Sequence, residues 1–310
     1  MSNFSFKNSV FIFLVVTLTN VSSIGHGKIK GGRYAKLGEF PFVGHIATVY
    51  PNKTLELCGC SLVSVSKIVT AGHCFVKWNT GVKTFLDLEL TIAYFGSLQL
   101  MGPDAHTSKL TSLKVPNGMR MRKRGGIMHD FALADLVTPV PITRTIKPFA
   151  VYSFEKNEFK SGWDEMVTSK VNCLTMGWGA KRFHVWRNTF VPKRASKYLK
   201  TIWVRPWEED KCQKLDGPSN DSMVPFGLVC VESISKRDAL LLGDSGCPLV
   251  CGDYVWGVGS TFAVDAPVYQ FILHWNYLGE LLFTTDSSVI CKICPQILLS
   301  TILYAILYFA

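Results

Sequence analysis

The sequence predicts an all-β fold, a sandwich or a barrel. Between Phe42 and about Thr261, short runs of Val, Ile, Leu, Thr and aromatic residues alternate with clusters of Gly, Pro, Asn and Lys. No internal repeat or long low-complexity linker divides the chain, so Ile29 to about Thr285 forms one continuous unit. With 310 residues and 48% hydrophobic content, the chain can bury one large or two small cores.

One helix is expected near the end of this unit. Phe271, Trp275, Leu278 and Leu282 follow one another at spacings of four, three and four residues. This spacing places them on one face of a helix, which we expect to pack against the β core.

Residues 1–23 have the layout of a signal peptide. Lys7 precedes an apolar run from Val10 to Leu18, and small polar residues follow up to Ser23. Because this run is too short to span a bilayer, we expect cleavage near Ser23 and a secreted, extracellular protein. A buried N-terminal strand is the alternative.

The C-terminal tail, residues 286–310, is hydrophobic. As a helix, Ile297 to Ala310 would reach only ~21 Å, which is less than a ~30 Å hydrocarbon core. Ser287 and Ser288, with a spacer of about eight residues, fit a glycolipid (GPI) anchor signal, although Val289 makes that spacer less polar than usual. Three interpretations stay open: an anchor on the outer cell surface, membrane insertion from Val289 onwards, and a docked tail.

The charge balance is basic, with a formal net charge of +10. Positive residues cluster in Arg120–Arg124 and along Lys181–Arg205. These loops either bind polyanions such as glycosaminoglycans or serve as solvated surface. Nucleic acid is excluded as a partner because the chain is expected to be secreted and shows no nucleic-acid-binding motif. No feature of the sequence indicates an oligomeric state.

Ten cysteines in a secreted chain predict disulfide bridges before metal ligands. No Cys/His group has convincing zinc spacing, so we expect no metal; Cys291 and Cys294 form a lone C-x-x-C pair, which is a weak signal. Asn52 and Asn220 begin glycosylation sequons, as expected on a secreted surface.

Three short segments carry residues suited to nucleophilic catalysis. They are Thr70-Ala-Gly-His73-Cys, His129-Asp130-Phe-Ala-Leu and Gly243-Asp-Ser245-Gly-Cys-Pro. Peptide cleavage needs a hydroxyl activated by an imidazole, and a buried carboxylate that orients the imidazole and stabilises its cation. The three segments supply one group of each kind, in the order His, Asp, Ser.

These segments resemble the A-A-H-C, D-I-A-L and G-D-S-G-G-P motifs of the S1 family of trypsin- and chymotrypsin-like serine proteases. The resemblance covers about Ile29 to Phe283, with further matches at residues 58–62, 173–179 and 256–260. It implies two six-stranded antiparallel β-barrels packed together with the active site between them, and a C-terminal helix. It also implies protein or peptide substrates and no cofactor.

The resemblance assigns roles to individual residues. Ser245 attacks the carbonyl, His73 shuttles the proton, and Asp130 orients His73. Ser260 stands where family members hydrogen-bond the triad carboxylate, and the N–H groups of Gly243 and Ser245 form the oxyanion hole. Gly243 suits this task because glycine can adopt conformations that point its amide inward.

The segment from Gly27 to Gly32 resembles the site where family zymogens are cut. Cleavage after Lys28 frees the amine of Ile29, which in the family pairs with the carboxylate preceding the nucleophile, here Asp244. This ion pair shapes the oxyanion hole, and each buried charge stabilises the other. Residues 24–28 are then a short activation peptide and 29–285 the protease domain; the alternative is that Lys28 is an ordinary exposed lysine.

The resemblance also pairs cysteines. It implies the bridges Cys58–Cys74, Cys173–Cys251 and Cys212–Cys230. Cys60 and Cys247 replace common glycines on strands that run close together behind the active site, so a Cys60–Cys247 bridge is predicted. Removal of the tail then leaves eight cysteines that pair completely.

The specificity pocket departs from the family pattern. Leu241 replaces the cysteine of the bridge that braces the pocket, and Ala239 stands at the base in the ungapped register. Asp238 takes that place if one residue is inserted. Phe262 replaces a glycine at the entrance, and Pro267 replaces another, removing a backbone donor. These changes predict small or uncharged side chains at the cleavage site.

Two functions follow from these observations. The first is an active endopeptidase with a specificity unlike that of trypsin. The alternative is a non-catalytic homologue that binds proteins or polyanions, since a fold alone does not establish a function.

Overall fold

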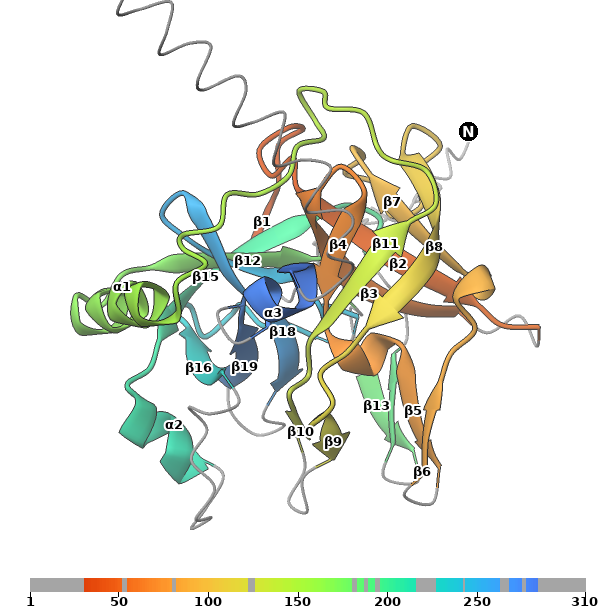
Figure 1. Ribbon diagram of the computed structural model, residues 1–310. Helices are drawn as coiled ribbons and strands as arrows, with labels where there is room; N and C mark the ends of the chain where they lie inside the picture. The colour runs from red at the N-terminus through yellow and green to blue at the C-terminus, as the bar shows by residue number, and fades with distance from the viewer. Residues whose placement is uncertain are drawn as a thin grey trace, which may run out of the picture.

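The computed structural model describes residues 31–283 apart from 52–54, 80–81, 122–125, 180–182, 187–188, 193–195, 216–226, 242, 263–267 and 275–276, and antiparallel strands dominate it (Figure 1). The first strands are β1 (Arg33–Tyr34), β2 (Val43–Val49), β3 (Leu55–Ser64), β4 (Lys67–Thr70), β5 (Val76–Asn79), β6 (Val82–Phe85), β7 (Thr91–Phe95), β8 (His106–Lys114), β9 (Arg120–Met121), β10 (Ile127–Met128) and β11 (Ala132–Leu136). The later strands are β12 (Cys173–Gly177), β13 (Phe183–Trp186), β14 (Thr189–Pro192), β15 (Lys200–Pro206), β16 (Leu228–Ser233), β17 (Pro248–Cys251), β18 (Tyr254–Phe262) and β19 (Val268–Leu273).

The N-terminal barrel closes in the order β11-β4-β3-β2-β7-β8. Along β7 the side chains alternate between buried and half-buried, as expected of a strand with one face toward a core. The apolar core inside this barrel includes Ile46, Leu62, Ile68, Phe75 and Phe95.

The C-terminal barrel follows the order β15-β12-β17-β18-β19-β16 and closes because β16 pairs back onto β15. The short β1 adds to the outside of β15. Two six-stranded antiparallel barrels are therefore present, and the predicted fold class is confirmed.

The two barrels share an apolar cluster where they meet. Val69 and Phe131, from the N-terminal barrel, pack in it with Val258 and Ile272, from the C-terminal barrel. Three segments lie next to this cluster: the 3₁₀ helix η1 (Gly72–Cys74) after β4, the turn before β11, and the loop before β17. These segments carry His73, Asp130 and Ser245.

The predicted C-terminal helix is shorter than expected. Helix α3 spans Leu278–Phe283 only, whereas Phe271 lies in β19 and pairs with Val229 and Gly259 on its two sides. Strand pairing on both edges outweighs the helical spacing of the apolar residues. The expected packing of Leu278 and Leu282 against the β core is observed.

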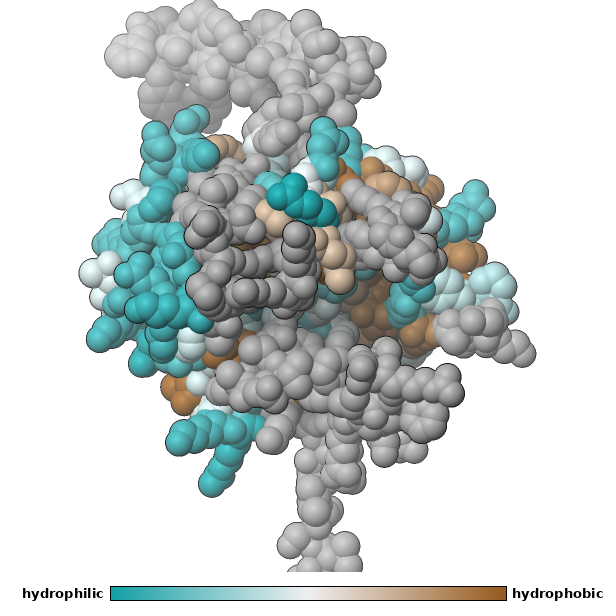
Figure 2. Space-filling view, turned by 90° about the horizontal axis from the view of Figure 1, so that it is seen from below, coloured by the Kyte–Doolittle hydropathy of each residue, from teal (hydrophilic) through white to brown (hydrophobic). Residues whose placement is uncertain are grey.

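A longer helix, α1 (Lys156–Thr168), was not predicted. The other helices of the described chain are α2 (Glu209–Leu215) and the 3₁₀ helix η2 (Leu88–Leu90). Helix α1 buries Phe159 and Trp163, four residues apart, and exposes charged residues elsewhere. In Figure 2 hydrophilic side chains gather on the left, the side on which α1 and α2 lie in Figure 1. Within the described ranges, no helix has the length and apolar character needed to cross a membrane.

Candidate active site

His73 lies in η1, three residues after the end of β4, and Asp130 lies two residues before the start of β11, the strand that pairs with β4. The backbone N–H of His73 donates to Asp130 Oδ1 at 2.7 Å, and His73 Nδ1 lies 2.7 Å from Asp130 Oδ2. Asp130 is fully buried, whereas the His73 side chain keeps 23% of its surface exposed. The carboxylate therefore fixes the proton of the neutral ring on Nδ1 and leaves Nε2 as the basic atom.

The pKa of His73 reflects two opposing effects. Burial disfavours the charged ring, but the charge of Asp130 and its hydrogen bond, with a smaller contribution from Glu56, outweigh burial and raise the pKa. The site therefore favours a protonated imidazole at the moment when a general base has taken up a proton.

Ser260, on β18, donates a hydrogen bond from its hydroxyl to Asp130 Oδ2. Asp130 thus accepts bonds from the His73 backbone, the His73 ring and Ser260. A buried carboxylate needs such partners, and these three come from both barrels.

The Ser245 loop docks onto the N-terminal barrel. The N–H of Gly59, on β3, donates to the carbonyl of Ser245 at 2.7 Å. Gly246 has a φ of +78°, and a Cβ there would lie 2.0 Å from Thr70 Oγ1 and 2.3 Å from the Gly59 carbonyl. Because Thr70 ends β4 three positions before His73, the loop sits against the chain that leads into His73.

A second set of bonds ties the Ser245 loop to Ser260. The N–H of Gly246 donates to the carbonyl of Gly259 at 2.7 Å, and the N–H of Gly259 donates to the carbonyl of Cys247 at 2.8 Å. Gly259 immediately precedes Ser260. The structure thus brings the four predicted residues His73, Asp130, Ser245 and Ser260 to one place at the barrel interface.

Gly243 and Ser245 present backbone donors at this place. Gly243 has a φ of +93°, which favours glycine. Among the described residues, no hydrogen bond uses the N–H of Gly243 or of Ser245.

Asp244 is buried and immediately precedes Ser245. Its Oδ1 accepts the Gly179 N–H at 2.7 Å and its Oδ2 the Leu241 N–H at 2.9 Å. Burial raises the pKa of Asp244 to about 7 despite these two bonds. A Cβ at Gly177 would lie 2.1 Å from Asp244 Oδ1, so a glycine is needed there.

The first described residues lie near the C-terminal barrel. Lys200 Nζ donates to the carbonyl of Gly31 at 2.7 Å, and the N–H of Gly32 donates to Asp238 Oδ1 at 2.8 Å. The Asp238 carboxylate therefore holds the N-terminal segment, and Ala239 packs among apolar side chains of the barrel.

A cavity of about 20 Å³ opens beside Ser245, which is room for about one water molecule. Neither Asp238 nor Ala239 lines it. Its described walls come from the Ser245 loop, β18 and β19: Leu240, Leu241, Asp244, Ser245, Gly259, Ser260, Thr261, Tyr269, Gln270 and Phe271.

The three bridges implied by the resemblance, Cys58–Cys74, Cys173–Cys251 and Cys212–Cys230, are confirmed. The predicted fourth bridge is wrong, because Cys60 and Cys247 are buried free thiols.

The alternation of side chains along β3 explains the missing bridge. Gly59 faces Cys247, whose Sγ lies 2.1 Å from the position that a Gly59 Cβ would occupy. Successive side chains of a strand point to opposite faces, so Cys60 points away, into the core of the N-terminal barrel.

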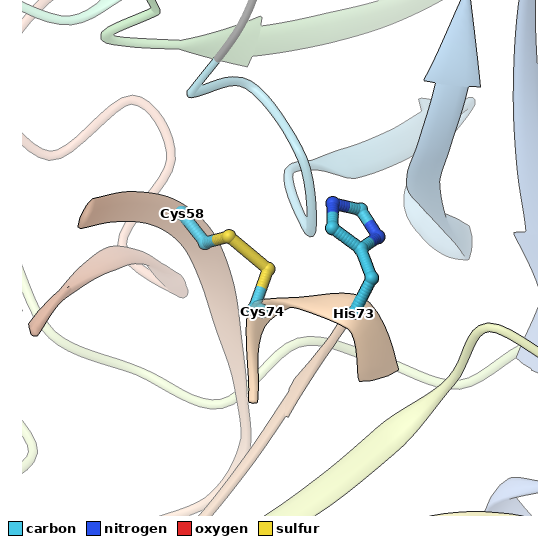
Figure 3. Close-up of side chains that lie close together, drawn as sticks. All are labelled: Cys58, His73 and Cys74. Carbon is cyan, nitrogen blue, oxygen red and sulfur yellow. A yellow bond between two sulfur atoms is a disulfide. The ribbon is translucent and has the colours of Figure 1, made fainter. Parts of the chain in front are cut away.

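Cys58, His73 and Cys74 form the one group in the described chain whose atoms are close enough to suggest a metal site, within 4.8 Å of one another. The two sulfurs are bonded to each other, and in Figure 3 the His73 ring stands to the right of that disulfide. A disulfide offers no thiolate, so this group does not fit a metal ion.

Several predicted residues lie outside the described residues. They are the signal and activation segments with Lys28 and Ile29, the sequons at Asn52 and Asn220, most of the basic cluster at 120–124, the side chain of Phe262, Trp275, Pro267 and the C-terminal tail.

Comparison with known proteins agrees with this geometry. The Trypsin family model matches residues 29–270. Human granzyme M is 27% identical over 79% of this chain and 81% of its own length, and human azurocidin 25% identical over 75% and 76%. Rat transmembrane protease serine 9 is 24% identical over 87% of this chain, which spans only 23% of that longer protein.

A solved structure titled human heparin binding protein has the same fold, with a TM-score of 0.57 and 19% identity over 83% of this chain and 97% of that one. The fold, the arrangement of the site and the match over most of the sequence lead to one conclusion: this chain belongs to the trypsin family.

Proposed function

We propose that the protein is a secreted serine endopeptidase whose catalytic triad is His73, Asp130 and Ser245. The observation that carries this proposal is the chain of hydrogen bonds from Ser260 through Asp130 to His73, next to the loop that bears Ser245. Three disulfides support an oxidising, extracellular setting.

The reaction follows from these positions. Ser245 Oγ attacks the carbonyl carbon of the scissile bond while His73 Nε2 takes its proton, and the carbonyl oxygen becomes an oxyanion that the N–H groups of Gly243 and Ser245 stabilise. His73 then gives the proton to the leaving amine and an acyl-enzyme remains. Water, deprotonated by His73, attacks the ester carbonyl. The bond to Ser245 Oγ then breaks, the acid leaves, and His73 returns the proton to Ser245 Oγ.

Activation by cleavage after Lys28 is part of this proposal. Burial raises the pKa of the Asp244 carboxyl group to about 7, so a nearby cation would stabilise its ionised form. The Ile29 ammonium, two residues before Gly31, is the group that we assign to it. The family match also begins at residue 29.

A fluorophosphonate probe tests the proposal directly. The chain, cut after Lys28, is expected to be labelled at Ser245, and Ser245→Ala is expected to show no labelling. Comparison with the uncut chain separates activation from triad assembly. Absence of labelling after verified cleavage would contradict the proposed activity.

The small volume of the cavity beside Ser245 favours substrates with small, uncharged side chains at the cleavage site. It has room for about one water molecule, and Asp238, which would select Lys or Arg, binds the N-terminal segment instead. We expect kcat/KM for Ala or Val substrates to exceed that for matched Arg substrates by at least about tenfold. Faster cleavage after Arg would overturn this specificity.

Polyanion binding is the second candidate function. The net charge of +10 favours it, and so does the likeness in fold to a structure titled human heparin binding protein. Alanine at Arg120, Arg122, Lys123 and Arg124 should then weaken retention on a heparin column, whereas alanine at exposed Lys156 and Lys160 on α1 should matter less. Retention that the first variant leaves unchanged would exclude this cluster as the binding surface.

A further inference from the structure

Tyr277 contacts both neighbours of Asp130. Its hydroxyl lies 2.8 Å from Nδ1 of His129, and its ring stacks on Phe131 with centroids 5.3 Å apart and planes 20° from parallel. Tyr277 is only 3% exposed and lies between β19 and α3. The residue thus reaches from the end of the C-terminal barrel to the turn that carries a catalytic group of the N-terminal barrel.

The turn around Asp130 is tight. His129 has a φ of +52°, in the left-handed region that few residues other than glycine adopt, and the N–H of Phe131 donates to the His129 carbonyl at 2.8 Å. On its other side the His129 ring lies over Gly118, where a Cβ would come within 2.7 Å of Cδ2. A backbone in such a conformation persists when surrounding contacts hold it.

Asp130 needs an exact orientation because it serves three donors at once. Its two oxygens accept from the His73 backbone, the His73 ring and Ser260. A small rotation of the turn would weaken at least one of these bonds, since hydrogen bonds weaken steeply with misalignment. None of the three disulfides of the described chain joins the turn to the C-terminal barrel, so the contacts of Tyr277 are suited to this task.

We propose that Tyr277 is a positioning residue that, through His129 and Phe131, holds Asp130 in line with His73. The proposal rests on the proposed protease function. Tyr277 acts through the backbone of the turn and touches no reacting atom, so its loss should weaken catalysis without changing the binding of substrate.

Tyr277→Phe removes the hydroxyl and keeps the ring that stacks on Phe131. We expect kcat to fall about threefold to tenfold with KM unchanged, as the loss of one hydrogen bond allows. The pKa of His73 should fall as well, because its imidazolium loses part of the stabilisation that Asp130 provides. The acid limb of the kcat/KM profile should move to lower pH.

Two variants serve as controls. His129→Asn should keep most of the activity, because Asn tolerates a positive φ and its amide can hydrogen-bond the Tyr277 hydroxyl, whereas His129→Val should behave like Tyr277→Phe or worse. Tyr152→Phe removes a hydroxyl from a ring stacked on Trp256, away from the triad, and should change neither kcat nor the pKa of His73.

An NMR titration of the His73 ring separates this proposal from the proposed function. If fluorophosphonate fails to label the wild type but Tyr277→Phe still lowers the pKa of His73, the positioning role is supported and the proposed protease function is contradicted. If the wild type is active and Tyr277→Phe leaves kcat and the pKa of His73 unchanged, the positioning role is overturned. A loss of activity with an unshifted pKa and a lowered melting temperature also overturns it.

Discussion

Asp130→Asn is expected to lower kcat about 10⁴-fold while KM changes little. The carboxylate accepts hydrogen bonds from the His73 ring and from Ser260, and its charge raises the pKa of His73. An amide of the same shape offers an N–H₂ group where an acceptor is needed and carries no charge, so His73 would adopt the wrong tautomer and lose the stabilisation of its cation.

Asp135→Asn is the matched control for this prediction. Asp135 lies on β11, five residues after Asp130, and bonds Lys67 and Ser112 in the N-terminal barrel. Its loss should cost about 1 kcal/mol of stability, because the pair is only partly buried, and leave kcat near the wild-type value. We would measure kcat of both variants and the wild type, each activated, on the best peptide substrate, and verify folding by circular dichroism. A loss below tenfold for Asp130→Asn would show that Asp130 does not serve the reaction.

His274→Phe is expected to make the protein more resistant to acid. His274 is fully buried, its ring stacks on Phe149 and meets Phe131 edge-on, and neither ring nitrogen has a partner among the described residues. Burial lowers the pKa of His274 to about 3 from an ordinary value of 6.5. Between these two pH values His274 is protonated in the unfolded chain and neutral in the folded protein. The free energy of unfolding therefore falls as the pH falls.

At pH 4 this effect amounts to about 3 kcal/mol relative to pH 7.5. Phe cannot take up a proton, so the stability of His274→Phe minus that of the wild type should rise by about this amount between the two pH values. His45 and Asp244 also titrate, but they are common to both proteins and cancel in the difference. Urea unfolding at several pH values measures this difference in the free energy of unfolding. Replacement of the exposed His106, as His106→Gln, is the control and should follow the wild type. If the stability of His274→Phe and that of the wild type changed in parallel with pH, the buried neutral histidine would be contradicted.

The segments that carry the proposed triad could be recognised in the sequence because chemistry restricts which residues can stand there. Only a few side-chain types can serve as a nucleophile, a base or an orienting acid, and the positive φ of Gly243 and Gly246 favours glycine at both positions. The two barrels followed from the resemblance that these segments carry, and the structure agrees with it.

Features that depend on the pairing of distant strands were harder to predict. Phe271 has the spacing of a helical residue, yet β16 and β18 pair with it on both sides. Asp238 stands one residue from the expected base of the pocket, but only the fold shows that its carboxylate bonds Gly32. Tyr277 has no recognisable motif, because its importance comes from where the chain returns to the Asp130 turn.

The position of Cys60 and Cys247 on opposite sides of β3 gives the protein an internal reporter of opening. Both thiols are wholly buried, and burial raises the pKa of each, so neither forms the reactive thiolate in the closed protein. Alkylation of Cys247 therefore requires the Ser245 loop to leave β3, and alkylation of Cys60 requires the N-terminal barrel itself to open. The order in which the two thiols react would reveal whether the active site comes apart before the barrel that carries His73 unfolds.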